Sequence, residues 1–304
     1  MKKLLLTLLA TIAFIAHADT REPVTIIYGF SAGDNSANYA RHMIEEANRI
    51  QDKYNFMFDA KPGAGQTVAV NYVKSTPNQI FMTSGAFWVR PNFYPDASYD
   101  VKEFRTIMSM CSVPFAVGSG KYKTWKDVPT DKAITVSTSG LGIVSHLVAI
   151  EIQKKYPKAI IVPFKSTTDA VLATSSGQVD FVVGFVGDIE KFTGGTDSNH
   201  NMTILGATGT APSGQYPTLV SQGFNRNLAK MSTPYNLMVP TSWSAEKAKE
   251  VRSYLVKAET NQAVRDSYAL DFCAPFQVPE KQLSTWFDEQ NKYWSSLTVG
   301  VKVD

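Results

Sequence analysis

The chain has 304 residues, of which 44% are hydrophobic and 19% charged, a composition that supports packed cores and excludes extended disorder. At roughly 100–200 residues per domain, this length predicts two domains. The formal net charge of +3 gives no basic footprint for nucleic acid, and two cysteines are too few for a disulfide-rich scaffold or a four-cysteine zinc site.

The first residues have the organisation of a signal peptide. Met1-Lys2-Lys3 is basic, the run from Leu4 to Ile15 is apolar, and Ala16-His17-Ala18 fits a cleavage site of the Ala-x-Ala type. The apolar run is shorter than the roughly 20 residues that a membrane-spanning helix needs. We therefore predict a signal peptide over residues 1–18, cleavage after Ala18 and an exported protein.

Export leaves the state of the two cysteines open. Cys111 and Cys273 would enter an oxidising compartment. They either form a disulfide, if their Cα atoms come within reach, or remain two buried thiols.

The first part of the mature chain alternates strands and helices. Residues 24–28 form a predicted strand, which a Gly-rich turn over 29–36 connects to a helical pattern. Further predicted strands at 54–59 and 80–83 also end in small residues. This alternation predicts α/β layers around a mainly parallel sheet.

A second α/β unit follows a long strand-like segment over residues 105–117. Its predicted elements are strands at 134–136, 160–162, 179–183 and 202–205, helices at 144–155 and 169–175, and a polar surface turn at 194–199. Residues 233–239 return the chain to the first unit, and two predicted helices, 247–258 and 280–295, close it.

This order predicts two α/β domains joined by a hinge with two chain crossings. Residues 19–118 plus 235–304 form the predicted first domain, and residues 119–234 form the second. A hinged clamshell of this kind binds ligands beyond the carboxyl ends of its strands, which is where the small-residue loops lie.

Three of these loops have the composition of an anion site. They are Ser31–Asn35, Ser139–Ser145 and Lys165–Thr167. Free N–H groups and the helix dipole at a helix N-terminus attract negative charge, and small residues let a carboxylate approach the backbone. Any one such loop is typical of a tight strand–helix turn, but three in two domains favour a binding function.

One motif offers an enzymatic alternative. Gly29-Phe30-Ser31-Ala32-Gly33 matches the nucleophile elbow of α/β-hydrolases and lies between a strand and a helix. The candidate bases His42, His146 and His200 lie in unsuitable contexts, and no upstream strand supplies an oxyanion loop. No metal-ligand spacing, dinucleotide fingerprint or Walker A pattern is present, so we predict no metal and no cofactor.

Further motifs occur in a fixed order along the mature chain. They are Gly29-Phe30-Ser31-Ala32-Gly33-Asp34-Asn35-Ser36-Ala37, Lys61-Pro62-Gly63-Ala64-Gly65-Gln66, Gly140-Leu141-Gly142-Ile143-Val144-Ser145-His146-Leu147, Val162-Pro163-Phe164-Lys165-Ser166-Thr167-Thr168-Asp169-Ala170 with Gly177-Gln178-Val179-Asp180, and Trp294 with Gly300-Val301-Lys302. In these segments the chain resembles the periplasmic substrate-binding proteins of tripartite tricarboxylate transporters, the Bug family.

The resemblance implies a periplasmic-binding-protein (flytrap) fold, without enzymatic activity, that hands a small organic ligand to a membrane permease. Ligands of the family are typically small carboxylates held between the lobes by backbone amides and hydroxyls. A monomer is the usual form of such a receptor. A binding component that feeds a sensor kinase would need the same flytrap and remains an alternative.

The predicted ligand-binding residues follow the aligned loops. They are Phe30, Ser31, Ala32, Gly33, Asp34, Asn35, Ser84, Gly85, Trp88, Ser139, Gly140, Ser145, His146, Phe164, Lys165, Ser166, Thr167 and Phe185. We expect the amides of Ser31–Asn35 to hold the anionic end, with Phe30 and Phe164 as apolar walls.

Several positions depart from the family pattern. Asp34 replaces a family glycine, and either points to solvent, as its loop position favours, or accepts a hydrogen bond from the ligand. Ser166 replaces another glycine and, with Thr167, adds hydroxyls. Trp88 either stacks on a flat ligand or packs in the core, and Arg90 either pairs with a carboxylate or lies on the surface.

Overall fold

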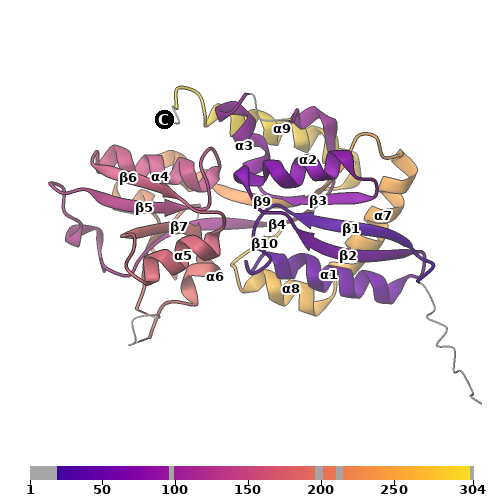
Figure 1. Cartoon of the computed structure of the whole chain (residues 1–304), viewed down its shortest axis with the longest axis horizontal. Helices are drawn as coiled ribbons and strands as arrows, with labels where there is room; N and C mark the ends of the chain where they lie inside the picture. Colours follow the sequence, from indigo (N-terminus) through magenta and orange to yellow (C-terminus); the bar gives the residue numbers. More distant parts are fainter. Residues whose placement is uncertain (1–18, 96–98, 196–200, 210–214, 302–304) are drawn as a thin grey trace, which may run out of the picture.

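The computed structural model describes residues 19–95, 99–195, 201–209 and 215–301. Two α/β lobes lie side by side and share a long strand (Figure 1). The predicted signal peptide and residues 196–199 of the predicted polar turn lie outside the described residues. None of the described helices has the length and apolar character needed to cross a membrane.

The first lobe contains the parallel strands β1 (Glu22–Tyr28), β2 (Tyr54–Ala60) and β3 (Gln79–Thr83). The sheet continues through β9 (Ser232–Pro240) to β4 (Phe104–Ser119) in the order β2-β1-β3-β9-β4, and the two-residue β10 (Ala274–Pro275) pairs with β4. The helices of this lobe are α1 (Ala37–Ile50), α2 (Thr67–Ser75), α3 (Ala86–Phe93), α7 (Ala245–Ala258), α8 (Gln262–Ala269) and α9 (Leu283–Ser296). They cover both faces of the sheet (Figure 1).

The second lobe contains β5 (Ile134–Thr138), β6 (Ala159–Pro163), β7 (Phe181–Phe185) and β8 (Thr203–Ala207). Its helices are α4 (Val144–Lys155), α5 (Thr167–Ser175) and α6 (Val186–Glu190). β5 is parallel to β6 and β7, whereas β4 runs antiparallel to β7 and β8.

The sheet is therefore mixed, and the prediction of a mainly parallel sheet was wrong. β9 is antiparallel to both β3 and β4 because it brings the chain back along the path that β4 took outward. Sequence periodicity gives the strands but not their relative directions, which depend on how the lobes are connected.

β4 and β9 form the connection between the lobes. β4 pairs with β9 from Phe104 to Pro114 and with β7 from Phe115 to Gly118, so its partner changes between Pro114 and Phe115. Pro114 has no N–H to donate and so suits a position where the ladder changes. The domain boundaries predicted above remain predictions at the level of single residues.

Three helices, α3, α6 and α8, were not predicted, and α6 has only five residues. α3 has an apolar composition without a clear helical stripe and contains Pro91, and α8 has only eight residues. Short helices of this kind give weak periodic signals. The predicted helix at 280–295 begins as a 3₁₀ turn, Glu280–Gln282, and continues as α9.

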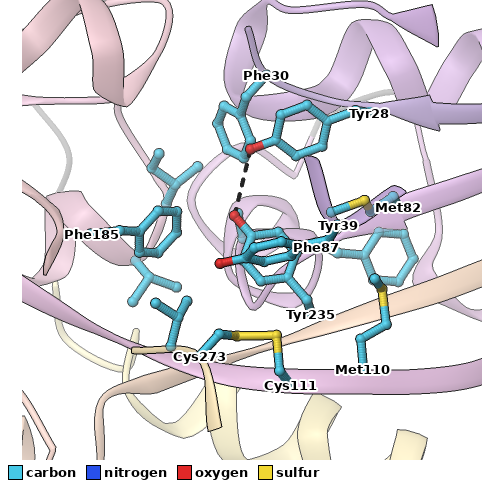
Figure 2. Close-up of a cluster of buried hydrophobic side chains, with 14 of the residues drawn as sticks. Tyr28, Phe30, Tyr39, Met82, Phe87, Met110, Cys111, Phe185, Tyr235 and Cys273 are labelled. Carbon is cyan, nitrogen blue, oxygen red and sulfur yellow. Dashed lines mark hydrogen bonds between the residues drawn. A yellow bond between two sulfur atoms is a disulfide. The ribbon is translucent and has the colours of Figure 1, made fainter. Parts of the chain in front are cut away.

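The two cysteines form a disulfide. Cys111 in β4 and Cys273 after α8 have Cα atoms 5.3 Å apart. Beside this disulfide lies a cluster of buried aromatic side chains, in which Tyr28, Phe30, Tyr39 and Tyr235 gather and Phe185 faces them from the second lobe (Figure 2). The disulfide and the aromatic cluster thus lie close to the strands β4 and β9 that connect the lobes.

Candidate functional site

The loop between β1 and α1 brings the first predicted site residues to the face that meets the second lobe. Phe30 is buried, whereas Ala32 and Gly33 are exposed at the tip of the loop. The Gly33 amide donates to Ser31 Oγ at 3.2 Å, and the Asp34 amide donates to the carbonyl of Ser31 at 3.1 Å. The loop is thus folded onto itself by its own hydrogen bonds.

This arrangement corrects the prediction that all amides from Ser31 to Asn35 receive the ligand. The amides of Gly33 and Asp34 are engaged within the loop, and the Asn35 amide donates to Asp188 Oδ1 at 3.2 Å. Among the described residues, the amides of Ser31 and Ala32 have no acceptor, so these two remain available.

Asp34 does not point to solvent, as its loop position had suggested. Asp34 is only 2% exposed, and its carboxylate reaches the second lobe, where Oδ1 accepts hydrogen bonds from Thr168 Oγ1 at 2.6 Å and from the Thr168 amide at 3.4 Å. Tyr28 donates to Oδ2 at 3.4 Å. The prediction of a solvated aspartate was wrong because contact with the second lobe buries Asp34, although Ala32 and Gly33 at the tip of the loop stay exposed.

Two further aspartates lie close by, and we call Asp34, Asp188 and Asp271 the seam carboxylates. Asp188 lies on α6 of the second lobe and Asp271 follows α8 of the first. The Asn35 side chain donates to Asp271 Oδ1 at 2.7 Å and Tyr39 donates to Oδ2, while Asp188 Oδ2 has no partner among the described residues. Lys191 Nζ lies 3.9 Å from Asp188 Oδ1 and is half exposed.

Burial makes ionisation of the seam carboxylates costly. Burial raises the pKa of Asp34 to about 6, against hydrogen bonds from Thr168 and Tyr28 that lower it. The pKa of Asp188 is raised well above its usual range by burial and then by the nearby charges of Asp271 and Asp34. Burial also raises the pKa of Asp271. The contact between the lobes therefore favours protonated carboxyl groups.

The loop after β5 is the second predicted anion loop. Ser139 Oγ and Ser145 Oγ lie 3.2 Å apart, and the Gly142 amide donates to His146 Nδ1 at 3.0 Å. Burial lowers the pKa of His146 to about 4, so the imidazole is neutral and acts as an acceptor. The buried His146 thus stabilises the loop after β5 through its hydrogen bond with Gly142. Its ring also packs against Phe93, with ring centroids 6.2 Å apart.

The third predicted loop leads into α5. Ser166 is buried and its hydroxyl accepts the Asp169 amide at 3.1 Å, which caps the helix. Thr167 is also buried, whereas Lys165 is exposed. The Ser166 hydroxyl accepts the capping hydrogen bond and keeps its own O–H, so its contact with a ligand stays a prediction.

A small enclosed cavity lies where the two lobes meet. Its volume of 10 Å³ is room for about one water molecule. Its lining combines aromatic and aliphatic walls with three hydroxyl groups, and consists of Phe30, Ala86, Phe115, Ser139, Ile143, Val144, Ser145, Thr167 and Phe185. We call this the inner cavity.

A larger groove of 1020 Å³ opens between the lobes and shares Ser139 with the inner cavity. It is lined by Gly63, Ala64, Gly65, Arg90, Tyr94, Ser139, Gly140, Leu141, Pro163, Phe164, Lys165, Asp169, Leu172, Ala173, Ser175, Ser176 and Gln178. Arg90 spans it, since Nε donates to Thr67 Oγ1 at 2.9 Å and Nη1 donates to the carbonyl of Leu141 in the other lobe at 2.7 Å. The lobes are in contact, as in a closed clamshell.

Some predicted site residues do not line either space. Trp88 is fully buried in the first lobe, where its ring packs edge-on against Trp286 and Phe287, so of its two alternatives the structure shows core packing and not stacking on a ligand. The Gly85 amide donates to Thr233 Oγ1 at 2.6 Å, and a Cβ at Gly85 would collide with Trp294. Ser84 is buried and accepts the Phe87 amide through its carbonyl, so Ser84 and Gly85 anchor α3 rather than line the cavity.

Sequence reasoning missed several residues at the contact between the lobes. Ala86 and Phe115 line the inner cavity, and Asp188 and Asp271 belong to the seam carboxylates. Asp188 follows a buried strand, which is the same signal that identified the other loops. Phe115 and Asp271 carry no local signal, because only the tertiary fold brings them to the site.

The residues of the hydrolase alternative are not assembled. Ser31 Oγ accepts the Gly33 amide, and no histidine in the described part of the chain bonds to it. Among the described residues, no group of three or more His, Cys, Asp or Glu side chains is arranged to hold a metal ion.

Solved structures with the same fold span nearly the whole chain. One described as a periplasmic transporter has 18% identity and a TM-score of 0.81, and the match covers 94% of this chain and 100% of that one. The periplasmic binding protein BugD has 18% identity and a TM-score of 0.77, with 91% and 97% covered. MatC from Rhodopseudomonas palustris with bound malate has 17% identity and a TM-score of 0.76, with 91% and 99% covered.

These likenesses define the class of the fold, which is that of the periplasmic binding proteins. The model of the tripartite tricarboxylate transporter family receptor, TctC, matches residues 40–300. The chain therefore belongs to this family of periplasmic solute receptors, which are binding proteins and not enzymes. No curated protein matches the chain.

Proposed function

We propose that the protein captures a small organic ligand with a carboxylate group in the inner cavity and delivers it to a tripartite membrane permease. The observation that carries this proposal is a cavity closed by both lobes, with Ser139, Ser145 and Thr167 as hydroxyl donors. Two free amides, those of Ser31 and Ala32, lie in the loop that carries Phe30. Hydroxyl and amide donors are the groups that hold a carboxylate without a cation.

The walls of the cavity indicate an apolar part of the ligand. Phe30, Phe115 and Phe185 meet there, and the rings of Phe115 and Phe185 have centroids 4.8 Å apart. A volume of 10 Å³ holds no organic ligand, so the lobes must open for entry and close less tightly around it. The related structure of Rpa4515 from R. palustris is described with adipate, and MatC with malate, which supports a carboxylate class.

The proposal also covers the processing, the oligomeric state and the domain boundaries of the protein. The signal peptide is cleaved after Ala18, and the mature receptor is a monomer with hinge-connected domains at 19–118 plus 235–304 and at 119–234. Mass spectrometry of the secreted chain tests the cleavage site. Light scattering of the purified protein tests the monomer.

A thermal-shift screen of residues 19–304 tests the ligand class. The panel consists of aliphatic dicarboxylates, aromatic monocarboxylates and, as matched controls, the corresponding amides and amines. A ligand that binds only the folded state raises the melting temperature by mass action, and we expect one carboxylate class to do so.

The variant Ser139→Phe locates the site. Its ring would fill the space that the inner cavity and the groove share, so we expect the shift with the carboxylate to disappear while the ligand-free melting temperature stays within a few degrees. Shifts only with amines, or a shift that survives in Ser139→Phe, would contradict the proposal.

A further inference from the structure

A third space, besides the inner cavity and the groove, lies in the first lobe, away from the contact between the lobes. Its volume is 320 Å³, which falls at the small end of the roughly 300–1,000 Å³ typical of ligand pockets. It is lined by the start of β4, the first half of α7, the 3₁₀ turn before α9 and the start of α9, through Phe104, Arg105, Thr106, Ile107, Ala245, Ala248, Lys249, Arg252, Glu280, Leu283, Ser284 and Phe287. α7 lies at the end of the first lobe remote from the second (Figure 1). We call this space the α7–α9 cavity.

The charged groups of the α7–α9 cavity are mostly basic. Arg105, Lys249 and Arg252 line it against one carboxylate, Glu280. The ion pair between Arg252 Nη1 and Glu280 Oε2 is long, at 3.9 Å, and Glu280 is half exposed. Lys249 makes no ion pair among the described residues. The cavity therefore has an excess of positive charge.

Several donors in the α7–α9 cavity lack acceptors. The side chain of Arg252 is only 16% exposed, yet its guanidinium makes no hydrogen bond to any described residue. Arg105 Nε and Thr106 Oγ1 are also buried and unpartnered, and Thr106 is only 6% exposed. Of the ten buried unpartnered polar atoms in the described chain, three belong to residues that line this cavity. These three atoms have almost no surface exposed to the cavity, so an occupant would instead meet the terminal nitrogens of Arg252 and the amine of Lys249, which have no hydrogen-bond partner among the described residues.

The backbone of the α7–α9 cavity is also incompletely paired. β4 pairs with β9 along one edge, whereas β10 meets its other edge only at Cys111 and Ser112. Residues 104–107 therefore have a neighbouring strand on one side only. Arg105 is held in place, because Nη2 donates to the carbonyls of Trp243 at 2.6 Å and Ser244 at 2.9 Å.

The remaining walls are apolar and decide the class of ligand. Phe104, Ile107, Leu283 and Phe287 would contact the body of an occupant, and the small side chains of Ala245 and Ala248 leave space for it. A planar guanidinium pairs bidentately with a carboxylate. We propose that the α7–α9 cavity is a second binding site, for a small organic carboxylate with an apolar body.

Calorimetric titration of residues 19–304 with hexanoate tests this site. We expect hexanoate to bind at millimolar or lower concentration, and hexan-1-ol, which lacks the charge, to bind more weakly. Arg252→Gln removes the charge-assisted hydrogen bonds and should weaken hexanoate binding by about tenfold or more. Arg226→Gln, an exposed arginine outside the cavity, is the matched control and should leave the affinity unchanged.

Two further variants separate the α7–α9 cavity from the contact between the lobes. Ala248→Leu fills the cavity and should abolish hexanoate binding, whereas Ser139→Phe should leave it intact. If Ala248→Leu does not fold, Arg252→Lys, which keeps the charge but loses the planar fork, replaces it and should give an intermediate affinity. Equal affinity in the wild type and Arg252→Gln, loss of binding in Ser139→Phe, or no hexanoate binding at millimolar concentration would overturn the proposal.

Discussion

At the scale of single residues, the contact between the lobes depends on a few polar groups that cross it. Asp34 reaches Thr168, the Asn35 amide reaches Asp188, and Arg90 reaches the carbonyl of Leu141. Each of these contacts exists only when the lobes meet. Loss of one partner leaves a buried polar group unsatisfied, which costs more than the hydrogen bond itself contributes.

Thr168 provides the sharpest single-residue test of closure. Thr168→Val keeps the shape of the side chain but removes the hydroxyl that donates to Asp34 at 2.6 Å. At a pH well above 6, where Asp34 is ionised, a hydrogen bond to this charged group contributes about 1.5–3 kcal/mol, so we expect the ligand affinity to fall by about tenfold or more. Thr168→Ser keeps the hydroxyl and should restore most of the affinity. Calorimetric titration of both variants decides, and equal affinities would contradict the role of this contact.

At the scale of elements, the disulfide ties the connecting strand β4 to the segment after α8. Cys111 and Cys273 are separated by 162 residues, so reduction frees a long loop in the unfolded chain. We expect the double variant Cys111→Ser/Cys273→Ser to lose about 2–5 kcal/mol of unfolding free energy. The melting temperature in the presence and absence of reductant measures this loss. Reductant should lower the melting temperature of the wild type only, and an effect on the double variant would point to another cause.

The same segment meets α6 at a glycine. A Cβ at Gly187 would overlap the carbonyl oxygen of Leu270 and the carboxylate of Asp271, which belong to the other lobe. Gly187→Ala should therefore hold the lobes apart, weaken ligand binding and leave each lobe folded. Small-angle scattering should show that the ligand no longer reduces the radius of gyration.

The control for this variant is Gly177→Asn. Gly177 has a φ of +77°, and no atom lies within 4 Å of a Cβ built there. Asparagine tolerates this backbone region, so the control tests the loss of a glycine without a collision. If both variants close normally on ligand, the contact at Gly187 does not limit closure.

The sequence predicted the strands, helices and loops better than the tertiary contacts between the two lobes. The loops after β1, β5 and β6 were predicted because small residues follow strands. Phe30, Ser139 and Thr167 from these loops line the inner cavity, and their contact with a ligand stays a prediction. Asp34 was misjudged because its burial arises from the other lobe. The aspartate that completes the seam, Asp271, lies 237 residues further along the chain, and no local pattern relates the two.

At the scale of the whole molecule, closure brings like charges together. Asp34 and Asp271 come from the first lobe and Asp188 from the second, and Asp169 on α5 adds a further negative charge near Asp34. The facing groups of opposite or neutral character are Lys191, Tyr28, Tyr39 and Tyr235. Separation of the lobes returns the carboxylates to water, where their charges are screened.

This arrangement links closure to pH. Asp34 has a pKa of about 6 in the closed protein and an ordinary value of 3.8 when solvated, so the closed form binds the proton more tightly. The stabilisation of the closed form by this proton is complete below pH 3.8 and is lost as the pH rises through about 6. For Asp34 alone, the loss amounts to about 3 kcal/mol of closure free energy. The raised pKa values of Asp188 and Asp271 act in the same direction.

Ligand affinity should consequently fall as the pH rises. Between pH 5.5 and pH 8, Asp34 alone accounts for a decrease of about fourfold, measured by titration with a carboxylate that is fully ionised over this range. Asp34→Asn removes the contribution of Asp34, because an amide keeps the shape of the side chain without the charge. The affinity of this variant should therefore differ less between pH 5.5 and pH 8 than that of the wild type. An affinity that is constant or rises toward pH 8 in the wild type would show that the seam carboxylates stay ionised in the closed form, and that the positive charge of Lys191 suffices to balance them.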